Sequence, residues 1–473
     1  MSDRPSMSAE PTATFDAGSF RDPGGRVFER GSRIFRTVSH GLADDFGWVI
    51  GSGLLDHLIA AGQVVPTRET TVRDPASNPS TWKVFESERI PYISYPYEWP
   101  FAALKRAALF HLDLHLAALE RGGTLVDASA YNVQFRGPQP IFIDVLSFRR
   151  YRDGDLWKGH RQFCEQFLNP LLLQATFGIP YHPWYRGAVE GIATREIAAL
   201  LKLRHKLSWT VLTHVVMLDR LQRMASADRV ERSAASMRRP LPKPAFRGLL
   251  SGLRKYIGRL EAVRAGPSSW SGYARENTYS DAEVKHKQRS VREFVETTRA
   301  ATVLDVGCNT GDYAAAALKA GAASVIGVES DPETANLAFE RAVAERLEFL
   351  PLVVDAANPS PAQGWQSLER RSFADRGRFD GVIALAFEHH LAIGRNIPLD
   401  QLVKWLVGLA PRGVIEFVPK EDPTIQRMLA LREDIFMDYS AANFESLLSG
   451  VARVTRKEQV SATGRTLFWF DRS

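Results

Sequence analysis

Two hydrophobic segments in the second half of the chain each contain an acidic side chain, one within the segment and one at its end. Residues 302–306 are mostly apolar, include Asp305 and run directly into a glycine turn at 307–311. The next apolar segment, residues 324–329, ends in Glu329. Parallel strands buried on both faces are apolar in this way, and glycines let a ligand approach the backbone. Since an acid at the end of the second strand accepts hydrogen bonds from ribose hydroxyls, the pattern predicts a nucleotide-type site.

The glycine spacing argues against a dinucleotide as the ligand. Gly307 and Gly311 do not form the Gly-x-Gly-x-x-Gly turn that cradles a pyrophosphate. The order Asp305, Gly307, Gly311 instead resembles motif I of class I S-adenosylmethionine-dependent methyltransferases. This resemblance implies that the glycines flank the methionine part of the cofactor and that Glu329 holds its ribose. A doubly wound domain with another nucleotide ligand is the competing interpretation.

The resemblance covers residues 268–473 and implies an α/β fold with a doubly wound, seven-stranded Rossmann-like sheet. Segments ending near residue 355, and starting at 379 and 413, resemble strands three to five, and 451–460 with 465–470 resemble a closing hairpin. Helices are expected at 313–320, 332–346, 400–409, 424–431 and 441–448. Such alternation of strands and helices predicts a mostly parallel sheet. The residues implied to contact the cofactor are Asp305, Gly307, Cys308, Asn309, Gly311, Glu329, Asp355, Ala356 and Tyr279.

The candidate catalytic residues are Glu388, His389 and His390, directly after the fourth strand. Open α/β sheets bind ligands outside the carboxyl ends of their strands, and in related methyltransferases this loop faces the substrate. A histidine suits a general base that removes a proton from a hydroxyl. The competing interpretation is that the histidines only shape the pocket. We expect no metal here, because no cysteine or carboxylate cluster stands at ligand spacing.

Two other segments are candidates for the same site. Tyr279 and Lys285 precede the first strand, where related enzymes place a lid helix; a helix that simply packs on the sheet is the other reading. Glu416 is unusual because it lies within an apolar strand. We expect it to face the substrate cleft or to pair with a lysine.

A second group of polar residues lies in the first half of the chain. Asp127 is followed by Asn132, and after two short apolar segments by Asp144. This order resembles the catalytic loop and metal-binding strand of protein-kinase-like phosphotransferases. The resemblance implies that Asp127 orients an acceptor hydroxyl, while Asn132 and Asp144 would hold magnesium only if the domain is active.

The surrounding segments predict an α+β domain over residues 26–200. Strands are expected at 26–29, 34–38, 82–86 and 90–95, and helices at 43–61 and 102–120. The domain departs from the kinase pattern: Leu125 replaces the catalytic-loop histidine, Arg36 stands where a lysine is usual, and a glycine-rich loop is missing. Three interpretations remain: a degenerate kinase-like domain that recognises the acceptor, a working phosphotransferase, or an unrelated α+β domain.

Aromatic residues are dense around residues 92–101, where we expect them to fill a core and a hinge; a platform for a sugar is the alternative. The segments 95–100, 141–148, 389–391 and 416–423 together resemble bacterial methyltransferases of the nodulation-protein NoeA type. That resemblance implies a methyltransferase that acts on a small molecule or a glycan.

Composition limits the remaining possibilities. The 473 residues carry a net charge of +6 and two cysteines, which excludes a disulfide framework and suits a reducing cytoplasm. Residues 1–25 are expected to form a flexible tail, and 201–267 a basic, proline-containing helical linker. Apolar runs are too short for a membrane span.

The sequence therefore predicts a cytoplasmic S-adenosylmethionine-dependent methyltransferase. It would methylate an oxygen of a hydroxyl-bearing small molecule or saccharide, which the domain at 26–200 would recognise. The alternatives are an RNA methyltransferase, favoured only by the basic linker, a bifunctional protein with a kinase-like phosphotransferase, and a binding protein without activity. The oligomeric state is not predicted.

Overall fold

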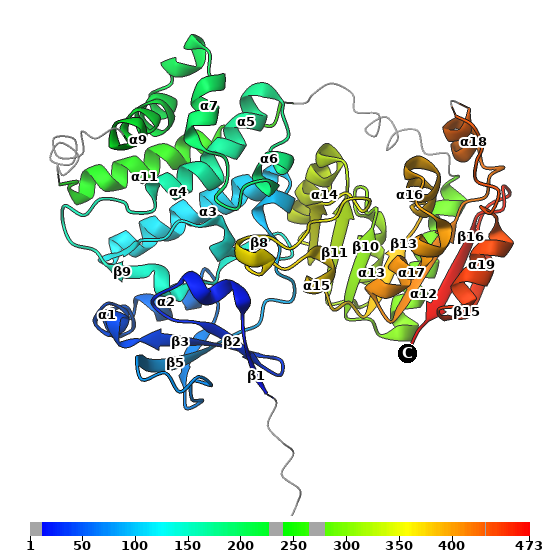
Figure 1. The fold of residues 1–473 in the computed structure, drawn as a ribbon, viewed down its shortest axis with the longest axis horizontal. Helices are drawn as coiled ribbons and strands as arrows, with labels where there is room; N and C mark the ends of the chain where they lie inside the picture. The colour runs from blue at the N-terminus through cyan, green and yellow to red at the C-terminus, as the bar shows by residue number, and fades with distance from the viewer. Residues whose placement is uncertain (1–11, 227–239, 264–279, 431) are drawn as a thin grey trace, which may run out of the picture.

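The computed structural model describes residues 12–226, 240–263, 280–430 and 432–473. These residues form two adjacent domains, with the antiparallel sheet and most helices of the first half on one side and an α/β domain on the other (Figure 1). None of the described helices combines the length and the apolar character needed to cross a membrane.

The second domain is built on a seven-stranded sheet in the order β12-β11-β10-β13-β14-β16-β15. The first five strands pair in parallel, and β16 runs antiparallel to both β14 and β15. The sequence predicts this arrangement of strands and the closing hairpin. The strands are β10 (Thr302–Val306), β11 (Ser324–Glu329), β12 (Phe349–Val353), β13 (Gly381–Ala384), β14 (Arg412–Phe417), β15 (Arg453–Gln459) and β16 (Thr466–Asp471).

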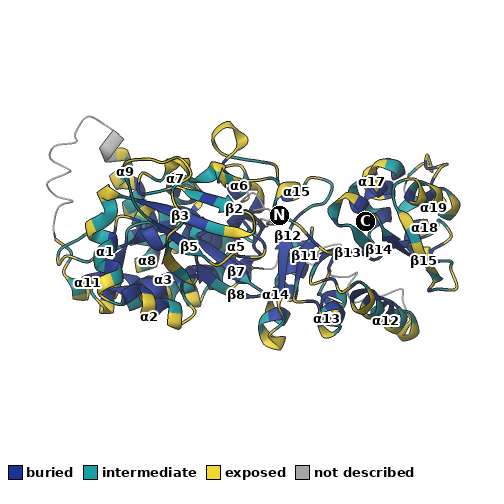
Figure 2. Cartoon of the chain, turned by 90° about the horizontal axis from the view of Figure 1, so that it is seen from below, coloured by how far each residue is buried: buried dark blue, intermediate teal, exposed yellow. Residues whose placement is uncertain are grey.

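Helices cover both faces of this sheet, which explains why its central strands are apolar throughout. Figure 2 shows α12, α13 and α14 on one face and α17 and α19 on the other. Side-chain caps at Ser280, Asp331, Asp422 and Ser440 define where α12, α14, α18 and α19 begin. The helices are α12 (Asp281–Thr298), α13 (Asp312–Lys319), α14 (Pro332–Glu345), α15 (Phe373–Arg376), α16 (Glu388–Arg395), α17 (Leu399–Leu409), α18 (Pro423–Leu429) and α19 (Ala441–Ser449).

The first domain begins with an antiparallel sheet in the order β1-β2-β3-β5-β4. Its strands are β1 (Ala13–Phe15), β2 (Val27–Arg30), β3 (Arg33–Ser39), β4 (Thr67–Thr70) and β5 (Thr81–Ser87). Three expectations for this region are wrong. Residues 13–15 pair with β2 although we expected a tail to residue 25, no strand forms at 90–95, and the helix at 43–61 is divided into α1 (Ala43–Gly51) and α2 (Leu54–Ala60). Gly53, with φ of +71°, interrupts that helix.

The rest of the first domain is arranged around the long helix α3 (Phe101–Glu120). Two antiparallel pairs of strands follow it: β6 (Gly123–Leu125) with β9 (Phe148–Arg150), and, between these two strands in the sequence, the hairpin of β7 (Val133–Arg136) with β8 (Gln139–Phe142). The remaining helices are α4 (His160–Phe163), α5 (Asn169–Phe177), α6 (His182–Arg186), α7 (Thr194–Leu200), α8 (Trp209–Val211), α9 (Leu218–Ser226) and α11 (Lys243–Gly258).

Helix α11 differs from the linker expected over residues 201–267. It packs along α3 and buries Phe246, Leu250, Leu253 and Ile257 completely. The positive charges in this stretch lie on the opposite, solvated face of an amphipathic helix. Composition alone predicts a linker, because the prolines and basic residues of this segment outnumber the four apolar positions that form the buried face of the helix.

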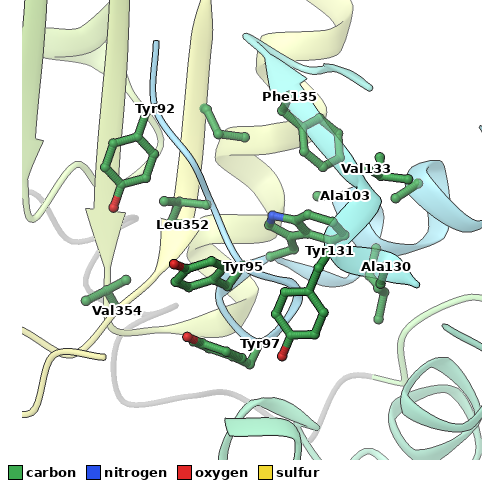
Figure 3. Packing of buried hydrophobic residues seen from close by; sticks show 14 of the residues in the cluster. Tyr92, Tyr95, Tyr97, Ala103, Ala130, Tyr131, Val133, Phe135, Leu352 and Val354 are labelled. Atoms are coloured by element: carbon green, nitrogen blue, oxygen red, sulfur yellow. The ribbon is translucent and has the colours of Figure 1, made fainter. Parts of the chain in front are cut away.

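The two domains share a continuous hydrophobic core. Tyr92, Tyr95 and Tyr97 of the first domain lie against Leu352 and Val354 of the second (Figure 3). These tyrosines are at most 6% exposed, so the aromatic segment fills a core, as the sequence predicts.

An ion pair is buried in the same junction. The side chains of Glu98 and Arg376 are each 1% exposed, and Arg376 Nη1 donates to Glu98 Oε2 at 2.8 Å and to the carbonyl of Ile93 at 2.8 Å. The guanidinium also lies 4.3 Å from the ring centroid of Tyr95. Glu98 raises the pKa of Arg376 above its ordinary value, against the effect of burial. The charges are therefore fully paired where the two domains meet.

Candidate active site

A cavity of about 700 Å³ lies at the carboxyl ends of the parallel strands of the second domain. Its walls come from the turn after β10, the ends of β11, β12 and β13, and helices α16 and α18. This is the position where open α/β sheets bind ligands. A second cavity, of about 760 Å³, lies between α3 and α14 and contains none of the predicted site residues.

The glycine turn after β10 is folded tightly against β11. The amides of Gly307 and Cys308 both donate to the carbonyl of Val328, at 2.9 and 3.1 Å. Gly307 has φ of +74°, and a Cβ there would lie 2.8 Å from the ring of Phe387. Gly311 has φ of +85°, and its Cβ would lie 2.5 Å from Phe349. Both positions require glycine, and the turn exposes its backbone to the cavity.

Two carboxylates stand at adjacent strand ends in the cavity wall. Glu329 Oε2 accepts the amide hydrogen of Asn309 at 3.2 Å, and Glu329 Oε1 accepts that of Asp331 at 3.0 Å. Burial raises the pKa of Glu329 above its ordinary value. Asp355, after β12, accepts from the amide of Ala357 at 2.9 Å. The sequence predicts both carboxylates here, and their backbone hydrogen bonds hold them in fixed positions.

Asp305 lies one layer deeper than the cavity surface. It is 1% exposed and does not line the cavity, and its Oδ2 has no hydrogen-bond partner among the described residues. Burial, followed by the nearby Glu329 carboxylate, raises its pKa to about 7. The expectation that Asp305 contacts the cofactor is therefore wrong, because its side chain is buried behind the cavity wall.

The other predicted cofactor residues divide into three groups. Gly307, Cys308, Asn309, Glu329, Asp355 and Ala356 line the cavity. Gly311 shapes the turn from behind it, and Tyr279 lies outside the described residues. Lys285 is exposed and does not reach the cavity, whereas its neighbour Val284 lines it.

Only one of the three candidate catalytic residues reaches the cavity. His390 lines it, and burial, then His389 and Arg465, lower the pKa of His390 to about 2. The rings of His389 and His390 are 4.0 Å apart, but His389 is 1% exposed and turns away from the cavity wall.

Glu388 has a place in the core that does not suit direct catalysis. It is fully buried, and its Oε1 accepts from the amide of Val418 at 2.8 Å and from the hydroxyl of Tyr439 at 2.7 Å. Its second oxygen lies 3.3 Å from Nδ1 of His389. The structure thus corrects the expectation that Glu388 and His389 face the substrate: Glu388 connects α16 to the residue after β14, and His389 is buried beside it.

Glu416 has the second of its two expected roles, because it pairs with a lysine. Its Oε1 lies 2.7 Å from Nζ of Lys287, and both side chains are almost completely buried. Next to this pair, Arg465 donates to Asp422 at 2.6 Å. The sequence did not indicate that α18 reaches the cavity, where Thr424, Arg427 and Met428 form part of the wall. The capping residue Asp422 before Thr424 was the available signal for a helix start at this strand exit.

The polar residues of the first domain also come together. Asn132 Nδ2 lies 3.5 Å from Asp144 Oδ2, and Asp127 has its pKa raised by burial and by the charge of Asp144. However, Arg36 on β3 donates to Asp144 at 2.7 Å and lies 3.1 Å from Asp22. The carboxylate implied to hold magnesium is therefore already paired with a guanidinium.

Comparison with known proteins places the chain in a family. The fold and the cavity define the class of protein, which has a doubly wound α/β domain with a ligand site over a glycine turn, joined to an α+β domain. The chain is 45% identical over 477 residues to nodulation protein NoeA of Rhizobium meliloti (strain 1021), a match that covers 100% of this chain and 99% of the relative. The chain therefore belongs to the NoeA family. No family model matches it.

Solved structures match the chain only in part. Magnesium protoporphyrin IX methyltransferase (ChlM) from Synechocystis PCC 6803 with bound SAH is 17% identical, with a TM-score of 0.31 over 47% of this chain and 95% of the other. N-methyltransferase NodS from Bradyrhizobium japonicum WM9 is 13% identical, with a TM-score of 0.30 over 41% of this chain and 98% of the other. TM-scores this low support no conclusion about function.

The raised pKa of Asp305 predicts a pH-dependent cost in stability. A folded-state pKa of about 7, against an ordinary value of 3.8, means that the native state holds this proton more tightly than the unfolded state does. Protonated Asp305 therefore makes its full contribution to the unfolding free energy below about pH 4, and this contribution is lost as the pH rises to about 7. Over this range the unfolding free energy of the wild type should fall relative to Asp305→Asn, by at most roughly 4 kcal/mol. Urea denaturation of both proteins at several pH values measures this; parallel curves would contradict the assignment.

Proposed function

We propose that this NoeA-family chain is an S-adenosylmethionine-dependent methyltransferase. One observation carries the proposal: the glycine turn, Glu329 and Asp355, which come from three adjacent strands, converge on a single cavity. The motif resemblance assigns each of them to a different part of the same cofactor.

The residues present fit this cofactor. Glu329 offers carboxylate oxygens to ribose hydroxyls, Asp355 offers an acceptor to an amino group, and the exposed backbone at 307–309 lets a chain pass closely. At Gly307 and Gly311 a Cβ would fill space that the turn needs. A volume of about 700 Å³ lies within the usual range of roughly 300–1,000 Å³ for small-molecule sites.

The transfer chemistry divides between the cofactor and the chain. When bound, the cofactor supplies a methyl group on a sulfonium, which is already a strong leaving group. The chain must hold an acceptor oxygen in line with that methyl group and receive the proton that the oxygen loses as the C–O bond forms. With its pKa lowered to about 2, the His390 imidazole is neutral at pH 7 and accepts a hydrogen bond from a hydroxyl. Because it holds a proton weakly, its role is to orient the hydroxyl, and the proton that the oxygen loses leaves to solvent.

The acceptor is proposed to be a hydroxyl-bearing small molecule or a saccharide, methylated on oxygen in the cytoplasm. The first domain, which shares a core with the second, would recognise it. An RNA acceptor loses support, because α11 of the basic segment packs into the first domain, while Arg238 and Arg239 lie outside the described residues.

A kinase-like phosphotransferase in the first domain is the second candidate function. The proximity of Asp127, Asn132 and Asp144 favours it, as does the arrangement of a five-stranded sheet, a long helix and a following hairpin. The Arg36 guanidinium opposes it, because it neutralises Asp144 where a metal ion would bind. We therefore assign this domain to recognition and not to phosphoryl transfer.

Removal of the ribose-binding carboxylate should weaken cofactor binding. Glu329→Ala is expected to lower the affinity for S-adenosylmethionine by roughly 10- to 100-fold, since hydrogen bonds to a charged group contribute about 1.5–3 kcal/mol. Isothermal titration calorimetry measures this, with Glu296→Ala, an exposed acid on α12, as the matched control. Equal affinities of Glu329→Ala and wild type would refute the assignment of the cavity.

Replacement of the cavity histidine should affect turnover and not cofactor binding. His390→Gln keeps a polar group of similar size, so the calorimetric affinity should change little, while methyl transfer should fall by roughly 10²-fold because the acceptor hydroxyl is no longer held in line. Transfer can be followed from labelled cofactor into extracts of cells that lack the protein, where the acceptor accumulates and gains one methylene in mass. A variant with full transfer activity would remove His390 from the mechanism.

The Arg36–Asp144 pair predicts that the first domain does not bind ATP with magnesium. Calorimetry of the full chain with ATP and Mg²⁺ should detect no binding, and Asp144→Ala should behave like the wild type. Magnesium-dependent binding that disappears in Asp144→Ala would instead support the phosphotransferase.

A further inference from the structure

Two histidines and a cysteine meet among the helices of the first domain. His160 Nε2 lies 2.7 Å from His214 Nδ1 and 3.6 Å from Cys164 Sγ. The three potential ligand atoms all lie within 4.8 Å of one another, and within the described part of the chain no other group of three such side chains does so. Cys164 and His214 are buried, whereas His160 is partly exposed. These residues belong neither to the cavity of the second domain nor to the Asp144 cluster.

The backbone at this cluster is unusual. Cys164 opens a π-helical turn, η6 (Cys164–Leu168), directly after α4, and His214 lies within a second one, η8 (Leu212–Met217). π-helical turns are rare and occur often at functional sites, where they redirect a side chain. Here they lie on both sides of the same three side chains, from segments that are distant in the sequence.

We propose that His160, Cys164 and His214 form a metal site with a preference for Zn²⁺. Imidazole nitrogen and thiolate sulfur are typical ligands of zinc, and the cluster contains no carboxylate that would favour calcium or magnesium. The fourth position is open to water on the partly exposed side of His160. Binding displaces the thiol proton of Cys164, which leaves to solvent, so no oxidant or reductant is involved.

Two of the three separations between ligand atoms can be compared with zinc geometry, and the third, between Cys164 and His214, is at most 4.8 Å. Tetrahedral zinc, with Zn–N of about 2.0–2.1 Å and Zn–S of about 2.3 Å, separates N from S by roughly 3.5 Å and N from N by roughly 3.3 Å. The observed separation of 3.6 Å between Cys164 Sγ and His160 Nε2 already fits. The two imidazole nitrogens, 2.7 Å apart, must separate by about 0.6 Å, which is within the range of side-chain rotation. The competing interpretation is a direct hydrogen bond between the two rings without a metal.

A metal here would connect two distant segments of the first domain. The ligands on α4 and η6 lie far before η8 in the sequence, and the bound ion would hold η8, and with it α9, against the core around α3. Since a metal that binds only the folded state stabilises it, this site has a structural role that does not depend on the proposed methyl transfer.

Cobalt(II) provides a direct probe of the site. The full chain, stripped with a chelator, should bind Co²⁺ stoichiometrically and show both thiolate-to-cobalt charge transfer and the visible bands of tetrahedral cobalt; Zn²⁺ should displace them. Cys164→Ser should abolish the thiolate band, and His214→Gln should weaken Co²⁺ binding at least tenfold. Since the chain has only two cysteines, Cys308→Ser is the matched control and should keep the band, as should His205→Gln.

Two results would overturn the proposal. One is a folded wild type, verified by circular dichroism, that shows no thiolate band and no rise in melting temperature with Zn²⁺, as a simple hydrogen-bonded histidine pair would behave. The other is a band that disappears in Cys308→Ser and persists in Cys164→Ser. If the Cys164 and His214 variants do not fold, X-ray absorption of the zinc-loaded wild type decides: one sulfur and two imidazole ligands support the site, and oxygen ligands alone refute it.

Discussion

The buried ion pair between Glu98 and Arg376 is the interaction on which the relation of the two domains depends. Removing two charges from water is costly, and the cost is recovered only when each charge has a complete set of partners. Arg376 has them only with the first domain in place: the carboxylate of Glu98, the carbonyl of Ile93 and the face of Tyr95. Separation of the domains would leave a guanidinium at an apolar surface, so these contacts oppose separation.

The junction between the domains reaches the cavity through Val354. Its side chain packs in the core that the two domains share, and the same residue lines the cavity next to Asp355. The first domain therefore supports the wall of the ligand site as well as standing beside it. If the first domain recognises the acceptor, as proposed, its fixed contact with the second domain would hold that acceptor at a defined distance from the methyl donor.

The sequence predicts the second domain better than the first for a physical reason. A parallel sheet covered on both faces requires apolar strands, and its crossovers require helices, so the order of elements can be read directly from residues 302–417. In the first domain, β4 is an exposed edge strand without an apolar pattern, and the segment at 90–95 is apolar because it enters the domain junction and not because it is a strand. Tertiary contacts at 90–95, and at α11, decide what local composition does not show.

The candidate site shows the same limit at the level of single residues. Strand ends locate Glu329 and Asp355 because the carboxyl edge of a parallel sheet is one place. The order Glu388, His389, His390 does not reveal which side chain faces the cavity, since α16 begins there and successive residues of a helix point in different directions. Burial then gives these groups a common electrostatic property: it raises the pKa of Asp305 and Glu329 and lowers that of His390. A cation bound near Glu329 would stabilise the ionised form of this buried carboxylate, although Arg395 and Arg427 also line the cavity. A sulfonium is a cation of this kind, whereas a pyrophosphate is an anion, so the carboxylate at the end of β11 agrees with the spacing of the glycines in favouring a sulfonium ligand.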